Sequence, residues 1–249
     1  MLRGGPSMRM PNSSRVFIAM GTDDRKVLST EFFGSWHWAA NDNFLRGSYE
    51  LSLTFRPFNS LSLSVNPSYS DRFDMLQYVS TEEMAGVNRY IFARIDQKVL
   101  GMSLRVNFNI TPDLTIQYWG QPFIACGEYS AFKMITDPHA EAFSERYREY
   151  TEDQMTFVEE EYYVDENNDG VSDYSFDVPD FTVDEWLSNL VVRWEFMPGS
   201  TAYLVWSQTR EYSDSAGAFN VRENMDHMFT DQMANNTFLL KVSYRFGLK

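Results

Sequence analysis

Apolar and polar residues alternate over long stretches of this chain. In residues 47–56 every second side chain is apolar, namely Tyr49, Leu51, Leu53 and Phe55. Residues 61–70 repeat the pattern, and residues 57–60 between them include a proline and an asparagine, which favour a turn. Because successive side chains of a strand point to opposite faces, each stretch predicts a β-strand with one apolar and one polar face. Together they predict an antiparallel hairpin.

The same hairpin pattern recurs along the chain. Four further strands flank two short turns that contain proline, at residues 100–110, 114–119, 187–196 and 201–209. A last strand is predicted over 237–246, and weaker patterns predict strands at 7–10, 15–21 and 26–39. The sequence therefore predicts about ten strands.

The connections between these strands are unequal. The turns inside the hairpins are short, whereas long polar segments, 71–89, 126–185 and 210–236, join one hairpin to the next. Short turns at one end and long loops at the other are typical of outer-membrane β-barrels. A soluble sandwich or lipocalin-like barrel also alternates, but Arg and Lys should then dominate its polar face, which here is rich in Ser, Thr and Asn.

We therefore predict an all-β fold, a transmembrane antiparallel β-barrel with about ten strands present. The chain is interpreted as the C-terminal part of a larger barrel. Residues 1–249 would form this one outer-membrane barrel domain, with a long acidic extracellular loop at about 127–185.

Composition is compatible with this prediction. Mean hydropathy is −0.40 although aromatic residues reach 16%, and a membrane barrel needs apolar residues only at alternate positions. No apolar run approaches the roughly 18 residues of a spanning helix. The first twenty residues lack a signal-peptide pattern, so we interpret Met1 as an internal start. The single cysteine, Cys126, excludes a disulfide framework within the chain.

The negative charge is concentrated in one segment. The net charge is −14, and residues 136–185 hold seventeen Asp and Glu against two Arg, a balance of −15 that leaves +1 for the remainder. Nucleic acid is an improbable partner for such a chain.

The order of motifs resembles a known family. The stretches that carry the resemblance are residues 2–6, 67–70, 92–98, 110–114, 121–123, 131–133, 192–196, 198–201, 203–208 and 238–246. They resemble the C-terminal barrel, a domain of unknown function, that follows a carbohydrate-binding family 9-like (DOMON-like) N-terminal domain in outer-membrane proteins. The resemblance implies an outer-membrane location and a carbohydrate-binding-like domain upstream. It brings no catalytic residue.

The sharpest local motif is an acidic loop at residues 165–173. Oxygen-bearing side chains stand at its positions 1, 3, 5 and 9, with Gly170 at position 6 for the turn. This spacing is typical of a calcium loop, in which alternate oxygens converge on one ion. The predicted ligands are Asp165, Asn167, Asp169 and Asp173 through their side chains and Val171 through its carbonyl. The bidentate Glu of a full EF-hand is missing, since position 12 is Phe176, so we expect weak affinity.

The sequence offers little for catalysis. The three histidines, His37, His139 and His227, are far apart, and no nucleophile elbow or phosphate-binding loop is present. Short loop helices are predicted at 141–150 and 224–233. Basic residues on the predicted inner face would form a structural ion-pair network or line an anion-attracting channel: Arg56, Arg105, Arg193, Lys241 and Arg245.

Three functions therefore stay open. We expect a non-enzymatic outer-membrane barrel of a Gram-negative bacterium that anchors or serves a carbohydrate-binding-like domain, with a calcium-binding surface loop, in glycan binding or uptake. The alternatives are a porin or transporter-type channel and a carbohydrate-active hydrolase. The expected partners are outer-membrane lipid, the barrel-assembly machinery and glycans, with no nucleic acid.

Overall fold

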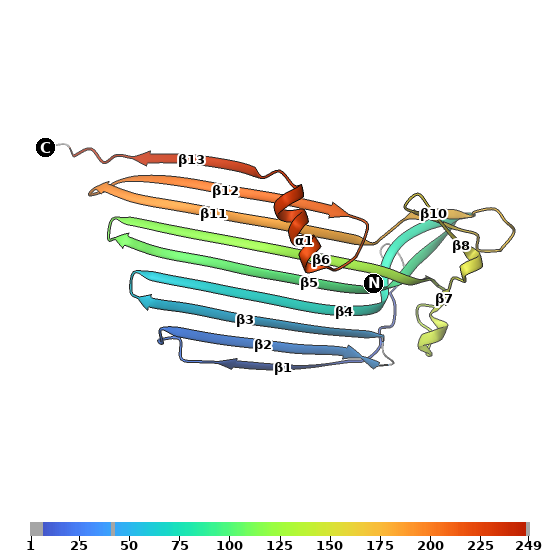
Figure 1. Cartoon of the computed structure of the whole chain (residues 1–249). Coiled ribbons are helices and arrows are strands. Elements are labelled where there is room, and N and C mark those ends of the chain that lie inside the picture. The colour runs from blue at the N-terminus through green and yellow to red at the C-terminus, as the bar shows by residue number, and fades with distance from the viewer. Residues whose placement is uncertain (1–6, 41–42, 248–249) are drawn as a thin grey trace.

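The chain folds into one large antiparallel β-sheet with a smaller β-structure at one end (Figure 1). The computed structural model describes residues 7–40 and 43–247. Nine strands follow one another across the large sheet: β1 (Ser13–Gly21), β2 (Leu28–Ala39), β3 (Phe44–Phe58), β4 (Leu61–Met84), β5 (Val87–Thr111), β6 (Leu114–Ile135), β11 (Phe181–Met197), β12 (Ser200–Asp214) and β13 (Asn235–Ser243).

The large sheet is open in the part of the chain that the structure describes. β1 pairs only with β2, and β13 pairs only with β12, so each of these two strands has a free edge. The predicted set of about ten antiparallel strands is confirmed, since the three-residue strand β7 (Tyr147–Glu149) adds a tenth by pairing with β6. A closed barrel is not formed by these residues.

Short turns lie at the end of the sheet drawn on the left in Figure 1. β3 and β4 are joined at residues 59–60, β5 and β6 at 112–113, and β11 and β12 at 198–199, which confirms the three predicted turns. Gly199 has a φ of +76°, a conformation that glycine adopts without strain.

The predicted loop at 71–89 is wrong. β4 runs on to Met84 and β5 begins at Val87, so the two strands form one long hairpin closed by Ala85 and Gly86. Both turn residues have positive φ, +51° and +77°, as a tight two-residue hairpin turn requires. The prediction failed because the far part of this hairpin mixes polar and aromatic residues and lacks a continuous apolar face.

The other two long connections are shorter than predicted. β6 continues to Ile135 and β11 starts at Phe181, so the acidic connection spans 136–180 rather than 127–185. β12 continues to Asp214, and the helix predicted at 224–233 is found as α1 (Val221–Asp226) followed by η4 (His227–Asp231). The helix predicted at 141–150 is only the single turn η2 (Phe143–Glu145), followed by β7. Residues 7–10 form no strand.

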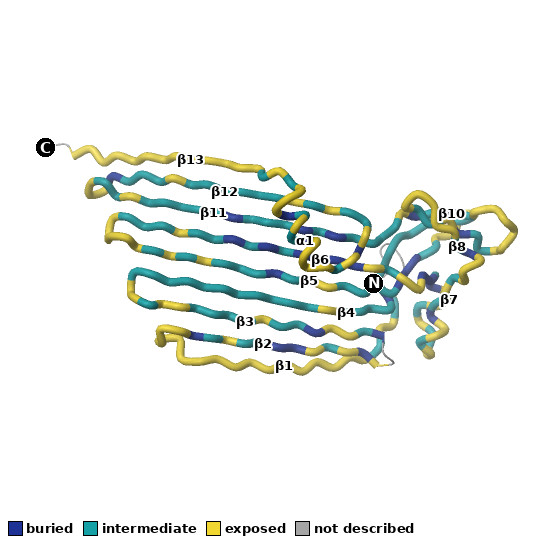
Figure 2. The backbone as a smooth tube through the Cα atoms, viewed as in Figure 1, coloured by how far each residue is buried: buried dark blue, intermediate teal, exposed yellow. Residues whose placement is uncertain are grey.

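Buried residues are concentrated at the end of the sheet opposite the short turns. Figure 2 shows most of the sheet as intermediate in exposure, with β1 and β13 exposed throughout. One buried cluster includes Ile91, Phe132 and Phe176, and another joins Ile124 and Cys126 to Met228 of η4. The middle of the large sheet therefore has no core of its own on either side.

Candidate functional site

One face of the large sheet is apolar from edge to edge. The register places Phe108 of β5 opposite Ile116 of β6, which in turn lies opposite Val192 of β11. The row continues through Leu204 of β12 to Leu240 of β13. Leu204 and Leu240 are 47% and 69% exposed, so no other part of the described chain covers this end of the row. We call this surface the apolar face.

Aromatic side chains lie at both ends of the apolar face. On β11, Trp186 and Trp194 belong to this face and are eight residues apart, about 27 Å along an extended strand. Towards the short turns the face also carries Phe55 and Phe108, and the register places Trp206 and Phe238 in the same row as Phe55. Towards the other end it carries Tyr49, Tyr69 and Trp36. An apolar band roughly 25 Å tall between two aromatic girdles is typical of the outer surface of membrane β-barrels.

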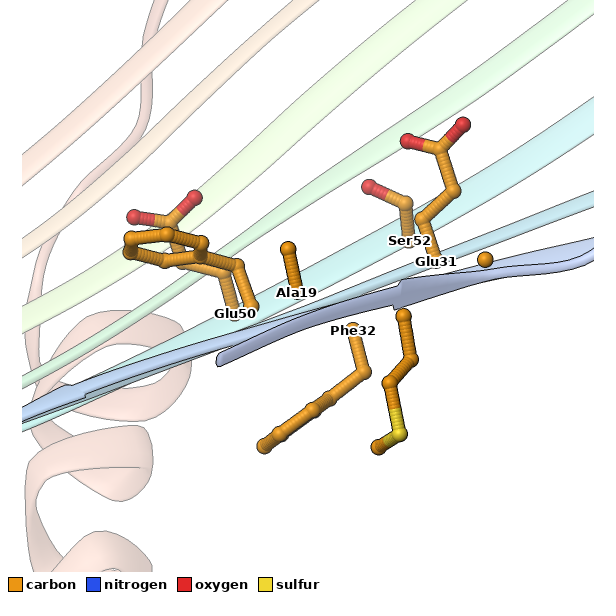
Figure 3. A pocket seen from close by; sticks show the side chains of 8 residues that line it. Ala19, Glu31, Phe32, Glu50 and Ser52 are labelled. Atoms are coloured by element: carbon orange, nitrogen blue, oxygen red, sulfur yellow. The ribbon is translucent and has the colours of Figure 1, made fainter. Parts of the chain in front are cut away.

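The opposite face is mainly polar, although Trp119, Val191 and Val205 also belong to it. Figure 3 shows Glu31, Glu50 and Ser52 pointing to one side of the sheet while Phe32 points to the other. Neighbouring hydroxyl groups on this polar face lie within hydrogen-bond distance, as between Thr54 and Ser64, whose oxygens are 3.2 Å apart. The alternation read from the sequence is therefore present as two chemically different faces.

The predicted ion-pair network on the polar face is reduced to one pair. Arg193 contacts Glu195 at 2.8 Å. Arg56 donates instead to the backbone carbonyl of Asp24 at 2.8 Å. Within the described residues, no ion pair involves the other predicted members, Arg105, Lys241 and Arg245, or Arg56.

The acidic connection 136–180 folds into a structured unit, the acidic cap. It contains η3 (Glu152–Gln154) and a three-stranded sheet of β8 (Met155–Val158), β9 (Glu161–Val164) and β10 (Tyr174–Asp177). Its buried residues Val164, Tyr174 and Phe176 pack against Ile91, Ala93 and Phe132 of β5 and β6. The rings of Phe132 and Phe176 are 5.4 Å apart. The cap is therefore anchored to the large sheet by a shared apolar core.

The predicted calcium ligands lie together in one loop of the cap, between β9 and β10. Asp165 accepts the backbone N–H of Gly170 at 2.7 Å through one oxygen and that of Asp169 at 3.1 Å through the other. Asp169 accepts from Val171 at 2.9 Å, and Asn167 from Asp169 at 2.9 Å. Gly170 has a φ of +86°, as the predicted turn requires.

Two of these oxygens meet at one donor, because Asp165 and Asn167 both accept the backbone N–H of Asp169. Asp173 accepts a different N–H, that of Glu166, at 2.8 Å. Among the residues that the structure describes, no group of three or more His, Cys, Asp or Glu side chains is arranged to hold a metal ion. Calcium binding at this loop stays a prediction, since an ionised carboxylate has about four lone-pair sites and can accept a backbone N–H and bind an ion together.

Glu166, inside the same loop, joins the cap to the large sheet. Its carboxylate contacts Arg89 of β5 at 2.9 Å and Arg148 of β7 at 3.4 Å, and it is only 13% exposed. Tyr174 donates to it at 3.3 Å, and the Tyr174 and Tyr150 hydroxyls are 2.8 Å apart. Burial raises the pKa of Tyr150 to about 12 and also raises the pKa of Tyr174. Sequence reasoning missed this cluster because its members come from distant segments.

A second cluster missed by the sequence lies under α1 and η4, which pack on the apolar face near β6 and β11. Asp184 of β11 is fully buried and accepts from Asn224 at 3.1 Å, while His227 Nδ1 lies 3.2 Å from the same carboxylate oxygen. The other oxygen of Asp184 has no partner in the structure. Cys126 is buried beside Asn224 and lies inside β6, which continues to Ile135. The buried carboxylate of Asp184 therefore binds both α1 and η4 to the sheet.

The histidines are not brought together. His37 lies on β2, His139 is in the cap, and His227 contacts Asp184 and stacks on Tyr212 with ring centroids 4.2 Å apart. No helix in the described chain is long and apolar enough to span a membrane.

Comparison with protein families gives one match, a domain of unknown function (DUF5916), over residues 3–246. No curated protein and no solved structure matches the chain. Since the match covers nearly all of its length, the chain belongs to the DUF5916 family.

Proposed function

We propose that this member of the DUF5916 family is the membrane-embedded sheet of a Gram-negative outer-membrane β-barrel. The barrel anchors or serves a carbohydrate-binding-like N-terminal domain, in glycan binding or uptake, and the acidic cap binds calcium. The observation that carries the proposal is the apolar face, which extends across nine strands and is edged by aromatic rings at both ends. In the described chain α1 and η4 cover it only near β6 and β11.

The apolar face is stable in one solvent and unfavourable in another. Soluble monomers rarely expose a contiguous apolar patch above a few hundred Å², and Leu204, Phe238 and Leu240 alone are 47%, 69% and 69% exposed. In lipid the same side chains are in a favourable medium, and Trp and Tyr are enriched at the two membrane interfaces. A lipid environment therefore accounts for a surface that water would penalise.

Strand direction adds a requirement on the complete barrel. β1 and β13 run in the same direction, because they are the first and last of nine antiparallel strands and the chain direction reverses an even number of times between them (Figure 1). Closing β1 directly on β13 would make a parallel pair, whereas barrels of this class are antiparallel with an even number of strands. We therefore propose that an odd number of further strands lies between β1 and β13.

Orientation follows from the connections. Outer-membrane barrels have short turns on the periplasmic side and long loops outside. The cap and α1 would then face the exterior, and the turns at 59–60, 112–113 and 198–199 would face the periplasm. The barrel-assembly machinery and outer-membrane lipid are the partners that this arrangement needs.

Spin labels on adjacent residues of β5 test the proposal. Leu104→Cys places a label on the apolar face and Ser103→Cys places one on the polar face, each in a Cys126→Ala background. In bilayers, lipid-soluble oxygen should relax the label at 104 more strongly than a water-soluble nickel chelate does, and the preference should reverse at 103. Equal access of the chelate to both labels would show that the face is not in lipid.

A further inference from the structure

Basic side chains stand side by side on the polar face, at the end of the sheet that carries the cap. Arg15 of β1 lies directly opposite His37 of β2, His37 opposite Arg46 of β3, and Arg46 opposite Arg72 of β4. Side chains directly opposite on neighbouring strands have Cβ atoms about 4.5–5.5 Å apart. These four residues form the basic row.

The basic row has no acidic partner. Within the described residues none of its arginines forms an ion pair, whereas Arg193 on the same face is held by Glu195 at 2.8 Å. Arg72 donates to the amide oxygens of Gln97 and Gln77 at 2.7 and 3.3 Å. The acidic residue next to the row on β4 is Asp74, which lies two residues beyond Arg72 on the same face. One of its oxygens accepts the N–H of Leu76 at 2.9 Å.

Such an arrangement is unfavourable by itself. Like charges directly opposite on neighbouring strands destabilise a sheet, and here Arg46 and Arg72 meet in that way. Neutral amides orient the Arg72 guanidinium without cancelling its charge. A bound anion would relieve the repulsion, because guanidinium groups form strong bidentate hydrogen bonds with carboxylate, sulfate and phosphate.

A cavity adjoins the row at His37. Its volume is about 230 Å³, and it lies between the segment that precedes β1 and the ends of β2, β3 and β4. Five of its lining residues are apolar, and four are polar. They are Met10, Pro11, Ala39, Phe44 and Leu76, and Ser13, His37, Asn43 and Asp74. The volume is below the roughly 300 Å³ at which pockets for drug-sized ligands begin, so a single ring is the size that fits.

We infer that the basic row and this cavity form a binding site for a small organic anion, a single ring that carries one carboxylate, sulfate or phosphate group. The ring occupies the cavity and the anionic group contacts the row. The site needs no membrane, so it does not depend on the proposed function.

Calorimetric titration of the whole chain in detergent micelles tests the site, with phenyl sulfate and inorganic sulfate as probes at constant ionic strength. Phenyl sulfate should bind more tightly than sulfate. Arg46→Gln and Arg72→Gln should each weaken both probes by about tenfold or more, as expected for loss of a hydrogen bond to a charged group. Arg193→Gln, which removes a paired arginine from the same face, should leave the affinities within about twofold.

Two more variants separate the parts of the site. Ala39→Leu fills the cavity and should reduce phenyl sulfate to the affinity of sulfate. Asp74→Asn removes a negative charge beside the row and should strengthen both probes. Without any anion, Arg46→Gln should raise the melting temperature, because it removes the repulsion across β3 and β4.

The inference is overturned if neither probe binds the wild-type chain, or if the Arg46 and Arg72 variants bind as the wild type does. A lower melting temperature of anion-free Arg46→Gln would also contradict it, since the row would then be stabilising by itself. If Ala39→Leu leaves the preference for phenyl sulfate unchanged, the cavity does not hold the ring.

Discussion

The large sheet and the acidic cap are both β-structures, yet they place their apolar residues in opposite ways. The cap buries Val164, Tyr174 and Phe176 against β5 and β6, and it leaves most of its carboxylates exposed, Glu166 apart. The large sheet leaves most of its apolar face uncovered, with Leu240 at 69% exposure. The cap therefore follows the rule of a protein in water, whereas the sheet has the pattern that the proposed lipid environment would explain.

Single strands pass from the region where protein buries the apolar residues to the region where the apolar face is uncovered. β5 runs from the cap core at Ile91 to the apolar face at Leu104. Ile91 is fully buried by protein, whereas no protein side chain covers the far ends of the face. If the proposal is correct, the surface of the membrane crosses β5 between these two residues.

The largest effect is expected from removing the centre of the cap core. Phe176→Ala should cost about 3–5 kcal/mol of cap stability, because a 5% exposed ring that contacts Phe132 and Tyr162 is lost. Hydrogen exchange should then show residues 136–180 opening while β11 and β12 remain protected. Phe157→Ala is the control, since that ring is 55% exposed and should cost under about 1.5 kcal/mol. Equal protection in the Phe176 variant would mean that the cap does not depend on this core.

The next prediction concerns the two faces of the sheet. Leu51→Arg should cost about 2–4 kcal/mol near the bilayer midplane, because lipid does not solvate a guanidinium. Ser52→Arg, its neighbour on the polar face, should be milder. The measurement is folding in outer membranes, followed by heat modifiability on gels. If the two variants fold equally well, the apolar face is not in lipid, and the proposed difference in environment between sheet and cap is wrong.

Alkaline pH should loosen the cap before the sheet. Because burial raises the pKa of Tyr150 to about 12, the folded cap holds this phenol neutral up to a higher pH than the unfolded chain does, where its pKa is about 10. The contribution of Tyr150 to the stability of the cap is therefore complete below about pH 10 and is lost as pH rises through about 12. Tyrosinate absorbance and hydrogen exchange should change together over this window. Tyr150→Phe should reduce both changes, because it removes the titrating phenol. A cap that stays protected well above this window would contradict the burial of Tyr150.

Alternation predicted the large sheet better than it predicted the cap. The strands follow from the alternation at residues such as Leu51, Leu104 and Leu240, because a strand with one apolar face is apolar at every second position. The three short turns follow from the turn residues between them. The cap strands were missed, since Glu161 and Asp177 lie next to the aromatic residues that are buried. Clusters such as Glu166 with Arg89, or Asp184 with His227, depend on contacts between segments 77 and 43 residues apart, which no local pattern reports. The same limit applies to the basic row, whose members meet only through strand register.

The smallest expected effect is the stabilisation of the cap by calcium. The loop of Asp165, Asn167 and Asp169 is already held by backbone hydrogen bonds, and Glu166 ties it to Arg89. We therefore expect calcium to add to the stability of a loop that also has hydrogen bonds of its own. A weak site with a Kd on the order of 10⁻⁴–10⁻³ M would still add about 1.4–2.7 kcal/mol at roughly 10 mM calcium, by mass action.

The measurement is limited proteolysis between residues 136 and 180, with calcium, magnesium or a chelator. Calcium should slow cleavage of the wild-type chain, and magnesium should protect less, because it dehydrates reluctantly and demands a stricter geometry. The double variant Asp165→Ala with Asp169→Ala should lose the calcium effect and should also be cleaved faster in chelator, since both carboxylates accept backbone N–H groups in the structure. Asp177→Ala, an acidic control outside the loop, should keep the calcium effect. If calcium and magnesium protect the wild type and the double variant equally, the ions merely screen the charge of the cap, and the difference between cap and sheet owes nothing to a metal.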